Sequence, residues 1–235
     1  MSSLPFIAHG PIAQAFAEQT RDYAFLYDRG QSAAWRGSRW VLGDKHDLLL
    51  KGSVNAFLNE LYPQYPSASG RKVLLDSRFR QGVVEQVKPL LPAWKFSERF
   101  DQDPFLLGVP GNAVVNLRTG QVREMTREDF VTKRTRVSPD ANCEPKLFLK
   151  FMDEITDGDR ELNGYLMRHA GYGLTGCTNE HCLPFWWGHG GNGKGVLLNV
   201  RQHIMGYEYG TVLRMSDLAR HETGNDNQRR IIAKL

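Results

Sequence analysis

The sequence predicts a mixed fold, in which an α+β N-terminal region is followed by the start of an α/β domain. Three observations support this prediction. Apolar residues recur at helical spacing near the N-terminus and again after residue 140. Short β-prone segments separated by turn residues lie between these two helical regions. A glycine-rich loop near residue 190 follows an apolar run and precedes a helix-like run, an order typical of phosphate-binding α/β domains.

The composition is that of an ordinary globular protein. Of its 235 residues, 41% are hydrophobic and 24% are charged, which excludes disorder of the whole chain. The net charge of +4 is a mild basic excess, compatible with a polyanionic partner. Three cysteines make no disulfide framework. Because we find neither a secretory signal nor an apolar run of membrane length, we expect a cytoplasmic protein with no membrane partner.

Helices and hairpins are both expected in the N-terminal region. Gly37-Ser38 and Thr119-Gly120 lie between β-prone runs and predict two hairpin turns. Pro89 and Pro92 predict the end of a helix. The expected elements are a helix over 10–27, a hairpin over 34–42, helices over 54–61 and 80–91, a loop over 101–112, a hairpin over 113–123 and a β segment over 131–137.

Helical spacing of apolar residues returns after residue 140. One helix is expected over 147–155 and a second over 162–169, and glycines interrupt the chain after the second. The sharpest boundary lies at 176–183. The expected organisation is a mixed helical and β N-terminal domain over 1–140, a helical bridge over 141–180 and the first part of an α/β domain over 181–235.

The glycine-rich loop carries the most specific chemistry. Gly188, four residues and then Gly193-Lys194 lie between an expected strand over 183–187 and an expected helix over 196–204. Glycines let successive backbone N–H groups turn inward, and a helix start favours anions. Lys194 is placed to reach the β and γ phosphates of a nucleotide. We therefore expect ATP, bound by Gly188, Gly190, Gly191, Asn192, Gly193, Lys194 and Gly195.

The position after Lys194 departs from the usual pattern. A Ser or Thr hydroxyl normally stands there and holds Mg²⁺, whereas this sequence has Gly195. Either Mg²⁺ bound with ATP is held by water, phosphate and a carboxylate from elsewhere, or metal use is impaired. The alternative interpretation of the whole segment is a glycine-rich turn with an incidental lysine. We predict no protein metal ligand in the loop.

The loop resembles the Walker A motif of superfamily-3 helicases, in particular the phage and plasmid primase–helicases related to the poxvirus primase–helicase. The Asn before Gly-Lys is characteristic of that group. Residues 112–120 are similar to its N-G-V-x-x-L-x-T-G segment, with Ala113 in place of Gly. Residues 130–135, 148–154 and 166–176 resemble further segments. The resemblance covers about 108–199, and residues 1–107 match only loosely.

The resemblance implies an α+β N-terminal region followed by the start of an α/β P-loop (AAA+) ATPase domain. It implies ATP-dependent unwinding of single-stranded or forked DNA in phage or plasmid replication, by a homo-oligomer that is usually a hexameric ring. Paired acidic residues of a Walker B strand follow Walker A in that family. Asp217, Glu222 and Asp226 end no apolar run. Since hydrolysis needs a positioned carboxylate, we predict that this chain alone binds ATP but is not a competent ATPase.

Two other functions stay open. The chain could be a non-catalytic DNA-binding or oligomerisation module with a vestigial P-loop, as in a prophage remnant. It could also be a small P-loop phosphotransferase, although the long N-terminal region and Asn192-Gly193-Lys194 argue against that class.

Several weaker patterns have a simple structural interpretation. Cys177, His181 and Cys182, with Cys143, offer zinc-ligand residue types, but buried thiols and a surface histidine are the simpler expectation.

Aromatic and basic residues offer further binding patterns. Trp35 and Trp40 with Arg36 and Arg39 could stack on bases, but core aromatics with solvated arginines are favoured. The basic run 133–136 could follow a phosphate backbone, or be a solvated strand edge. Trp186 and Trp187 are expected to pack inside a buried parallel strand, not against adenine.

Overall fold

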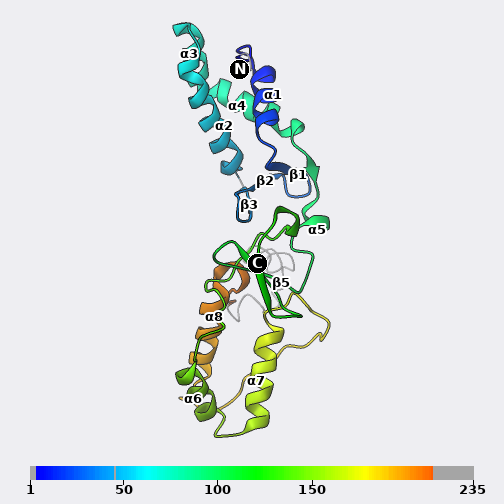
Figure 1. The fold of residues 1–235 in the computed structure, drawn as a ribbon, viewed down its shortest axis with the longest axis vertical. Helices are drawn as coiled ribbons and strands as arrows, with labels where there is room; N and C mark the ends of the chain where they lie inside the picture. Colours follow the sequence, from blue (N-terminus) through cyan, green and yellow to red (C-terminus); the bar gives the residue numbers. More distant parts are fainter. Residues whose placement is uncertain (1–3, 45, 214–235) are drawn as a thin grey trace, which may run out of the picture. The chain divides into compact units, whose positions relative to one another are not determined.

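The computed structural model describes residues 4–44 and 46–213, which form two compact units. Unit 1 consists of the chain up to Gln102 together with Thr126–Thr132. Unit 2 consists of Asp103–Met125 together with the chain from Lys133 onward. The elements of each unit can be followed by colour and label in Figure 1.

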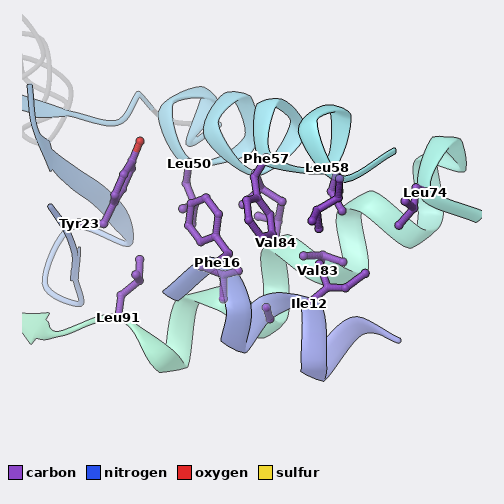
Figure 2. Close-up of a cluster of buried hydrophobic side chains, with 14 of the residues drawn as sticks. Ile12, Phe16, Tyr23, Leu50, Phe57, Leu58, Leu74, Val83, Val84 and Leu91 are labelled. Carbon is purple, nitrogen blue, oxygen red and sulfur yellow. The ribbon is translucent and has the colours of Figure 1, made fainter. Parts of the chain in front are cut away.

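Most helices of unit 1 contribute side chains to its main hydrophobic core. The helices of this unit are α1 (His9–Gln19), α2 (Leu48–Leu61), α3 (Ala68–Leu75), α4 (Ser77–Val87) and the short α5 (Phe96–Arg99), whose Phe96 packs against a second cluster. The 3-10 turns are η1 (Tyr62–Gln64), η2 (Lys88–Leu90) and η3 (Arg127–Asp129). Figure 2 shows Phe16 of α1, Phe57 of α2 and Val84 of α4 gathered in one cluster of side chains. Buried residues recur at helical spacing along α2, so this helix presents one continuous apolar face to the core.

A four-stranded sheet completes unit 1. Its strands are β1 (Tyr23–Leu26), β2 (Gln31–Trp35), β3 (Trp40–Leu42) and β4 (Ala93–Trp94). The strand order is β3-β2-β1-β4, with antiparallel pairing between the first three strands and parallel pairing of β1 with β4. Trp40 and Phe100 are fully buried in a second cluster, where the Trp40 ring stacks on Phe130. The Trp40 Nε1–H donates to the Arg127 carbonyl at 2.8 Å, which satisfies the buried indole.

The described part of unit 2 combines a small sheet with three helices. The sheet is an antiparallel meander of β5 (Leu106–Val109), β6 (Ala113–Asn116) and β7 (Gln121–Glu124). The helices are α6 (Lys146–Ile155), α7 (Arg160–Tyr172) and α8 (Lys194–Tyr209). Leu107, Val109 and Val115 form its buried cluster, against which Leu174 and Tyr209 pack.

The mixed α and β character predicted for the N-terminal region is confirmed. Both predicted hairpins form, and Gly37 and Gly120 have positive φ angles of 75° and 74° in their turns. The helices expected over 147–155 and 162–169 appear as α6 and α7. The predicted domain bounds at residues 140 and 180 stay predictions, because the two compact units divide the chain by packing and not by family segment.

Three predicted elements of secondary structure are wrong, and one helix was not predicted. The helix expected over 10–27 ends at Gln19, because Tyr23–Leu26 pairs with β2 and β4 as a central strand of the sheet. The loop expected over 101–112 contains β5, which pairs with β6. Residues 131–137 form no strand, although the Thr135 N–H donates to the Gly108 carbonyl at 2.9 Å. Helix α3 was not expected, since its apolar positions are few.

The strand expected over 183–187 is also wrong. A parallel strand exists only where neighbouring strands accept and donate its backbone hydrogen bonds. Among the described residues, neither the β3-β2-β1-β4 sheet nor the β5-β6-β7 sheet includes this segment. The run therefore approaches the glycine loop as irregular chain.

Candidate phosphate-binding loop

The glycine loop leads directly into α8. Gly191 and Gly193 have φ angles of 78°, in the left-handed region that residues with a Cβ rarely adopt. Gly193 is the N-cap of α8 and Lys194 is its first residue. The first N–H groups of a helix have no intrahelical partner and lie at the positive end of the helix dipole. The predicted order of glycine loop and helix is therefore present in the structure.

Gly193 also packs closely against side chains of α6. A Cβ at this position would lie 2.4 Å from Cγ2 of Ile155 and 3.2 Å from Cε2 of Phe151. Any larger residue would have to push α6 away from the start of α8. Both the backbone conformation and the packing thus require glycine at residue 193.

The Lys194 side chain folds back over the loop. Its Nζ donates to the Gly188 carbonyl at 3.1 Å, to the His189 carbonyl at 3.2 Å and to Oδ1 of Asn192 at 2.6 Å. The ammonium group therefore lies inside the curve of the loop. A phosphate oxygen entering the loop would meet this positive charge directly.

A cavity of about 320 Å³ lies next to the loop. Its walls are mostly apolar and aromatic, with Asn192 and Lys194 as polar groups. Such a combination is typical of small-molecule sites. The lining side chains come from α6, α7, the segment before the loop, the loop itself and α8: Ile155, Leu162, Tyr165, Leu166, Pro184, Phe185, Trp186, Trp187, Asn192, Lys194 and Leu197.

The two tryptophans before the loop have different environments. Trp187 is 87% exposed, so the expectation that it packs inside a buried strand is wrong. The missing sheet partners are the physical reason, because only neighbouring strands and their covering helices would bury both faces. Trp186 is half-buried, with its ring 6.1 Å from the His169 ring and 5.7 Å below the Arg201 guanidinium.

Arg201 and His169 were not predicted as site residues. Arg201 Nη1 donates to His169 Nδ1 at 2.8 Å, and Nη2 donates to the His169 carbonyl at 3.2 Å. Because a guanidinium can only donate, Nδ1 must accept, so the imidazole is neutral. Burial, and then the charge of Arg201, lower the pKa of His169, while burial lowers the pKa of Arg201. The signal available in the sequence was that Arg201 follows Lys194 by about two helical turns, on the same face.

The cysteine and histidine residues do not assemble into a metal centre in the described residues. No three His, Cys, Asp or Glu side chains gather as ligands in residues 4–44 and 46–213. Cys143 and Cys182 are exposed, so the expectation of buried thiols is wrong for these two.

The tryptophan hairpin is part of the core of unit 1. Trp40 is fully buried, which confirms the core interpretation for this ring. Arg36 is exposed and its Nη2 donates to Ser53 at 3.2 Å, whereas Arg39 donates to the Thr132 carbonyl at 3.4 Å. A base-stacking platform would need an open tryptophan face, and Trp40 has none.

The basic run 133–136 is held by the C-terminal turn of α8. The Arg134 N–H donates to Oε2 of Glu208 at 2.8 Å, and the Arg136 N–H donates to the Ile204 carbonyl at 3.0 Å. The Tyr209 hydroxyl donates to the Lys133 carbonyl at 3.2 Å. The backbone is thereby fixed while the side chains of Arg134 and Arg136 remain exposed.

Some expectations fall on residues that the structure does not describe. Asp217, Glu222 and Asp226, considered above as possible carboxylates of an ATPase, lie outside the described residues. None of the helices in residues 4–44 and 46–213 combines the length and the hydropathy that a membrane span requires.

Comparison with known proteins defines the class of this chain. Residues 13–157 match the family described as "D5 N terminal like", and the chain belongs to this family. The family is of the primase–helicase type. The match reaches much further toward the N-terminus than residue 108, where the specific sequence motifs begin. The glycine loop at 188–195 lies beyond the matched residues.

Viral proteins are the relatives found by sequence. Over 155 residues, 63% of this chain, the sequence is 26% identical to the protein named "Putative primase" of African swine fever virus. The same values hold for the warthog isolate from Namibia, the pig isolate from Kenya and the Vero-adapted Badajoz strain. The chain spans only 16% of the length of these relatives.

Proposed function

We propose that this chain is part of a replication protein of the primase–helicase type, and that its glycine loop binds the phosphates of ATP. The observation that carries the proposal is the position of Lys194. Its ammonium lies inside a loop in which Gly191 and Gly193 have positive φ, and Lys194 is the first residue of a long helix. Backbone N–H groups, a helix start and a lysine together supply the donors that a triphosphate requires.

Magnesium fits the loop less well than phosphate does. The segment from Gly188 to Gly195 contains no carboxylate and no hydroxyl side chain. Mg²⁺ prefers oxygen ligands, so any ion bound with ATP would be held by phosphate oxygens, water and a carboxylate from elsewhere. The loop alone therefore supports binding of ATP without supplying the groups that hydrolysis needs.

The loop sequence supports a more specific proposal. Asn192-Gly193-Lys194 resembles the Walker A motif of superfamily-3 helicases, and the family match is of the primase–helicase type. In the complete protein, an AAA+ ring assembled from several copies would couple hydrolysis of ATP to unwinding of DNA. Our proposal for this chain is limited to nucleotide binding and to contact with DNA.

Nucleotide binding can be tested with a fluorescent ATP analogue, in the presence and absence of Mg²⁺. The wild-type chain should bind saturably, and Lys194→Ala should weaken binding by at least about tenfold, since a charge-assisted contact is lost. Lys150→Ala is the matched control, because Lys150 is an exposed lysine of α6 paired with Glu154 at 3.7 Å. Binding that does not depend on Lys194 would reject the proposal.

Contact with DNA is the second function, and the basic run favours it. The backbone of 133–136 is fixed by α8, so Arg134 and Arg136 can meet phosphates without ordering a loop. In a DNA-binding module with an unused P-loop, this surface alone would be functional.

Fluorescence anisotropy with a labelled single-stranded oligonucleotide tests this surface. The double variant Arg134→Ser and Arg136→Ser should weaken binding and reduce its salt dependence by roughly one unit of slope per lost phosphate contact. The double variant Arg160→Ser and Arg168→Ser, at two exposed positions of α7, is the charge-matched control. An equal loss of DNA affinity in the test variant and in the control would show that only the net charge matters. That result would reject 133–136 as a DNA-binding surface.

A further inference from the structure

Asn192 lies across the loop between its first glycine and its lysine. Oδ1 of Asn192 accepts from Nζ of Lys194 at 2.6 Å. On the other side of the amide, Nδ2 lies 2.5 Å from where a Cβ on Gly188 would be. The Asn192 side chain therefore spans the loop, and only glycine at residue 188 leaves room for it.

The donors of Lys194 are fully used within the loop. An ammonium group has three N–H donors, and three oxygens accept from it: those of Gly188, His189 and Asn192. Two of these acceptors are backbone carbonyls. Asn192 supplies the only side-chain acceptor and the shortest of the three distances, and a hydrogen bond to a charged donor is stronger than a neutral one.

We propose that Asn192 is a positioning residue that holds Lys194 against the loop until a nucleotide phosphate displaces it. The inference rests on the proposed nucleotide binding. All three donors of the ammonium are used, so a phosphate oxygen has to displace one acceptor. The Asn192 side chain can rotate away, whereas the two carbonyls belong to the loop backbone, so we take Oδ1 as the acceptor that competes with the ligand. A competing contact in the unbound state lowers the apparent affinity by the fraction of chains that it holds in the unreceptive form.

The first test measures ATP-analogue affinity in Asn192→Ala and Asn192→Asp. Asn192→Ala removes the competitor and should tighten binding about three- to tenfold, the fold-change that corresponds to one hydrogen bond of ordinary net strength. Asn192→Asp places a carboxylate beside Lys194 and should weaken binding by more than about tenfold, because it pairs with the ammonium and repels phosphate. Weaker or unchanged binding in Asn192→Ala would overturn the proposal, since Asn192 would then contact the nucleotide or do nothing.

A second measurement does not depend on nucleotide binding. Acylation of lysines by an activated ester, followed by mass spectrometry, reports how freely each amine leaves its acceptors. Without nucleotide, Lys194 should react faster in Asn192→Ala than in the wild type, while Lys150 should react equally in both. If Lys194 reacted equally fast in Asn192→Ala and in the wild type, the proposal that Asn192 restrains Lys194 would be overturned. Faster reaction in a chain that binds no ATP would reject the proposed nucleotide binding and leave the restraint standing.

Discussion

The helices of unit 1 and those of unit 2 both carry apolar residues at helical spacing, but they are buried very differently. Five residues of α2 are buried, from Leu50 to Leu61. By contrast α6 buries only Met152, α8 buries only Leu197 and α7 buries none of its residues. Large apolar side chains of unit 2 are open to solvent, among them Leu147 at 83% and Tyr207 at 90%. Helical periodicity thus predicts which face is apolar, but the surrounding elements decide whether that face is covered.

The sharpest test of this difference compares two tryptophans. Trp40→Ala should lower the free energy of unfolding by about 3–5 kcal/mol, because a fully buried ring and its hydrogen bond to the Arg127 carbonyl are lost. Trp187→Ala should change it by no more than about 0.5 kcal/mol, since exposed side chains contribute little. Urea unfolding followed by far-ultraviolet circular dichroism measures both. Similar losses in the two variants would show that Trp187 is buried in solution.

Two glycines of the loop give the next largest effect. Gly193→Ala should destabilise unit 2 by about 1–3 kcal/mol, because the added methyl meets Ile155 and the residue has a φ of 78°. Gly190→Ala should cost less than about 0.5 kcal/mol, since nothing lies within 4 Å of a Cβ there and its φ is not positive. Thermal unfolding of both variants checks this pair. An equal loss would mean that the α6 contact with the loop does not form.

Helix caps should behave alike in the two units. Asp76 accepts from the Phe79 N–H at 2.8 Å at the start of α4, and Asp159 accepts from the Glu161 N–H at 2.9 Å at the start of α7. Replacing either aspartate with alanine should cost about 1 kcal/mol, because capping acts within the first turn whatever the core around it. Urea unfolding of the two variants is the measurement. A much larger loss of unfolding free energy in the Asp76 variant would show that loss of this cap also disturbs the packing of the core of unit 1.

The smallest effect is a pH dependence from His169. Burial and Arg201 lower the pKa of this imidazole from 6.5, so the unfolded chain binds the proton more readily than the folded chain. The contribution of neutral His169 to the free energy of unfolding is therefore complete above pH 6.5. It is lost as the pH falls through the lowered pKa of His169 in the folded state. The difference in unfolding free energy between the wild type and His169→Gln, measured from pH 8 to pH 5, should therefore shrink with falling pH. A constant difference would contradict the contact between His169 and Arg201.

Local backbone conformation was predictable from the sequence wherever residues that are neighbours in the chain decide it. Gly37 and Gly120 supply the positive φ that their hairpin turns require, and both hairpins were predicted. The helices over 147–155 and 162–169 followed from apolar spacing. The helix after the glycine loop, expected over 196–204, followed from the same short-range rules and appears as α8, which begins at Lys194.

Tertiary pairing decided the remaining features, because it depends on residues far away in the chain. Tyr23–Leu26 has helical apolar spacing but becomes a strand since β2 and β4 lie beside it. Residues 183–187 have strand-like composition but no strand partner among the described residues. At the candidate site, the sequence by itself determined a glycine loop with a lysine at a helix start. Only the three-dimensional structure placed Arg201 over Trp186 and Asn192 against Lys194, because residue spacing gives the face of a helix on which a side chain lies but not the group that it contacts.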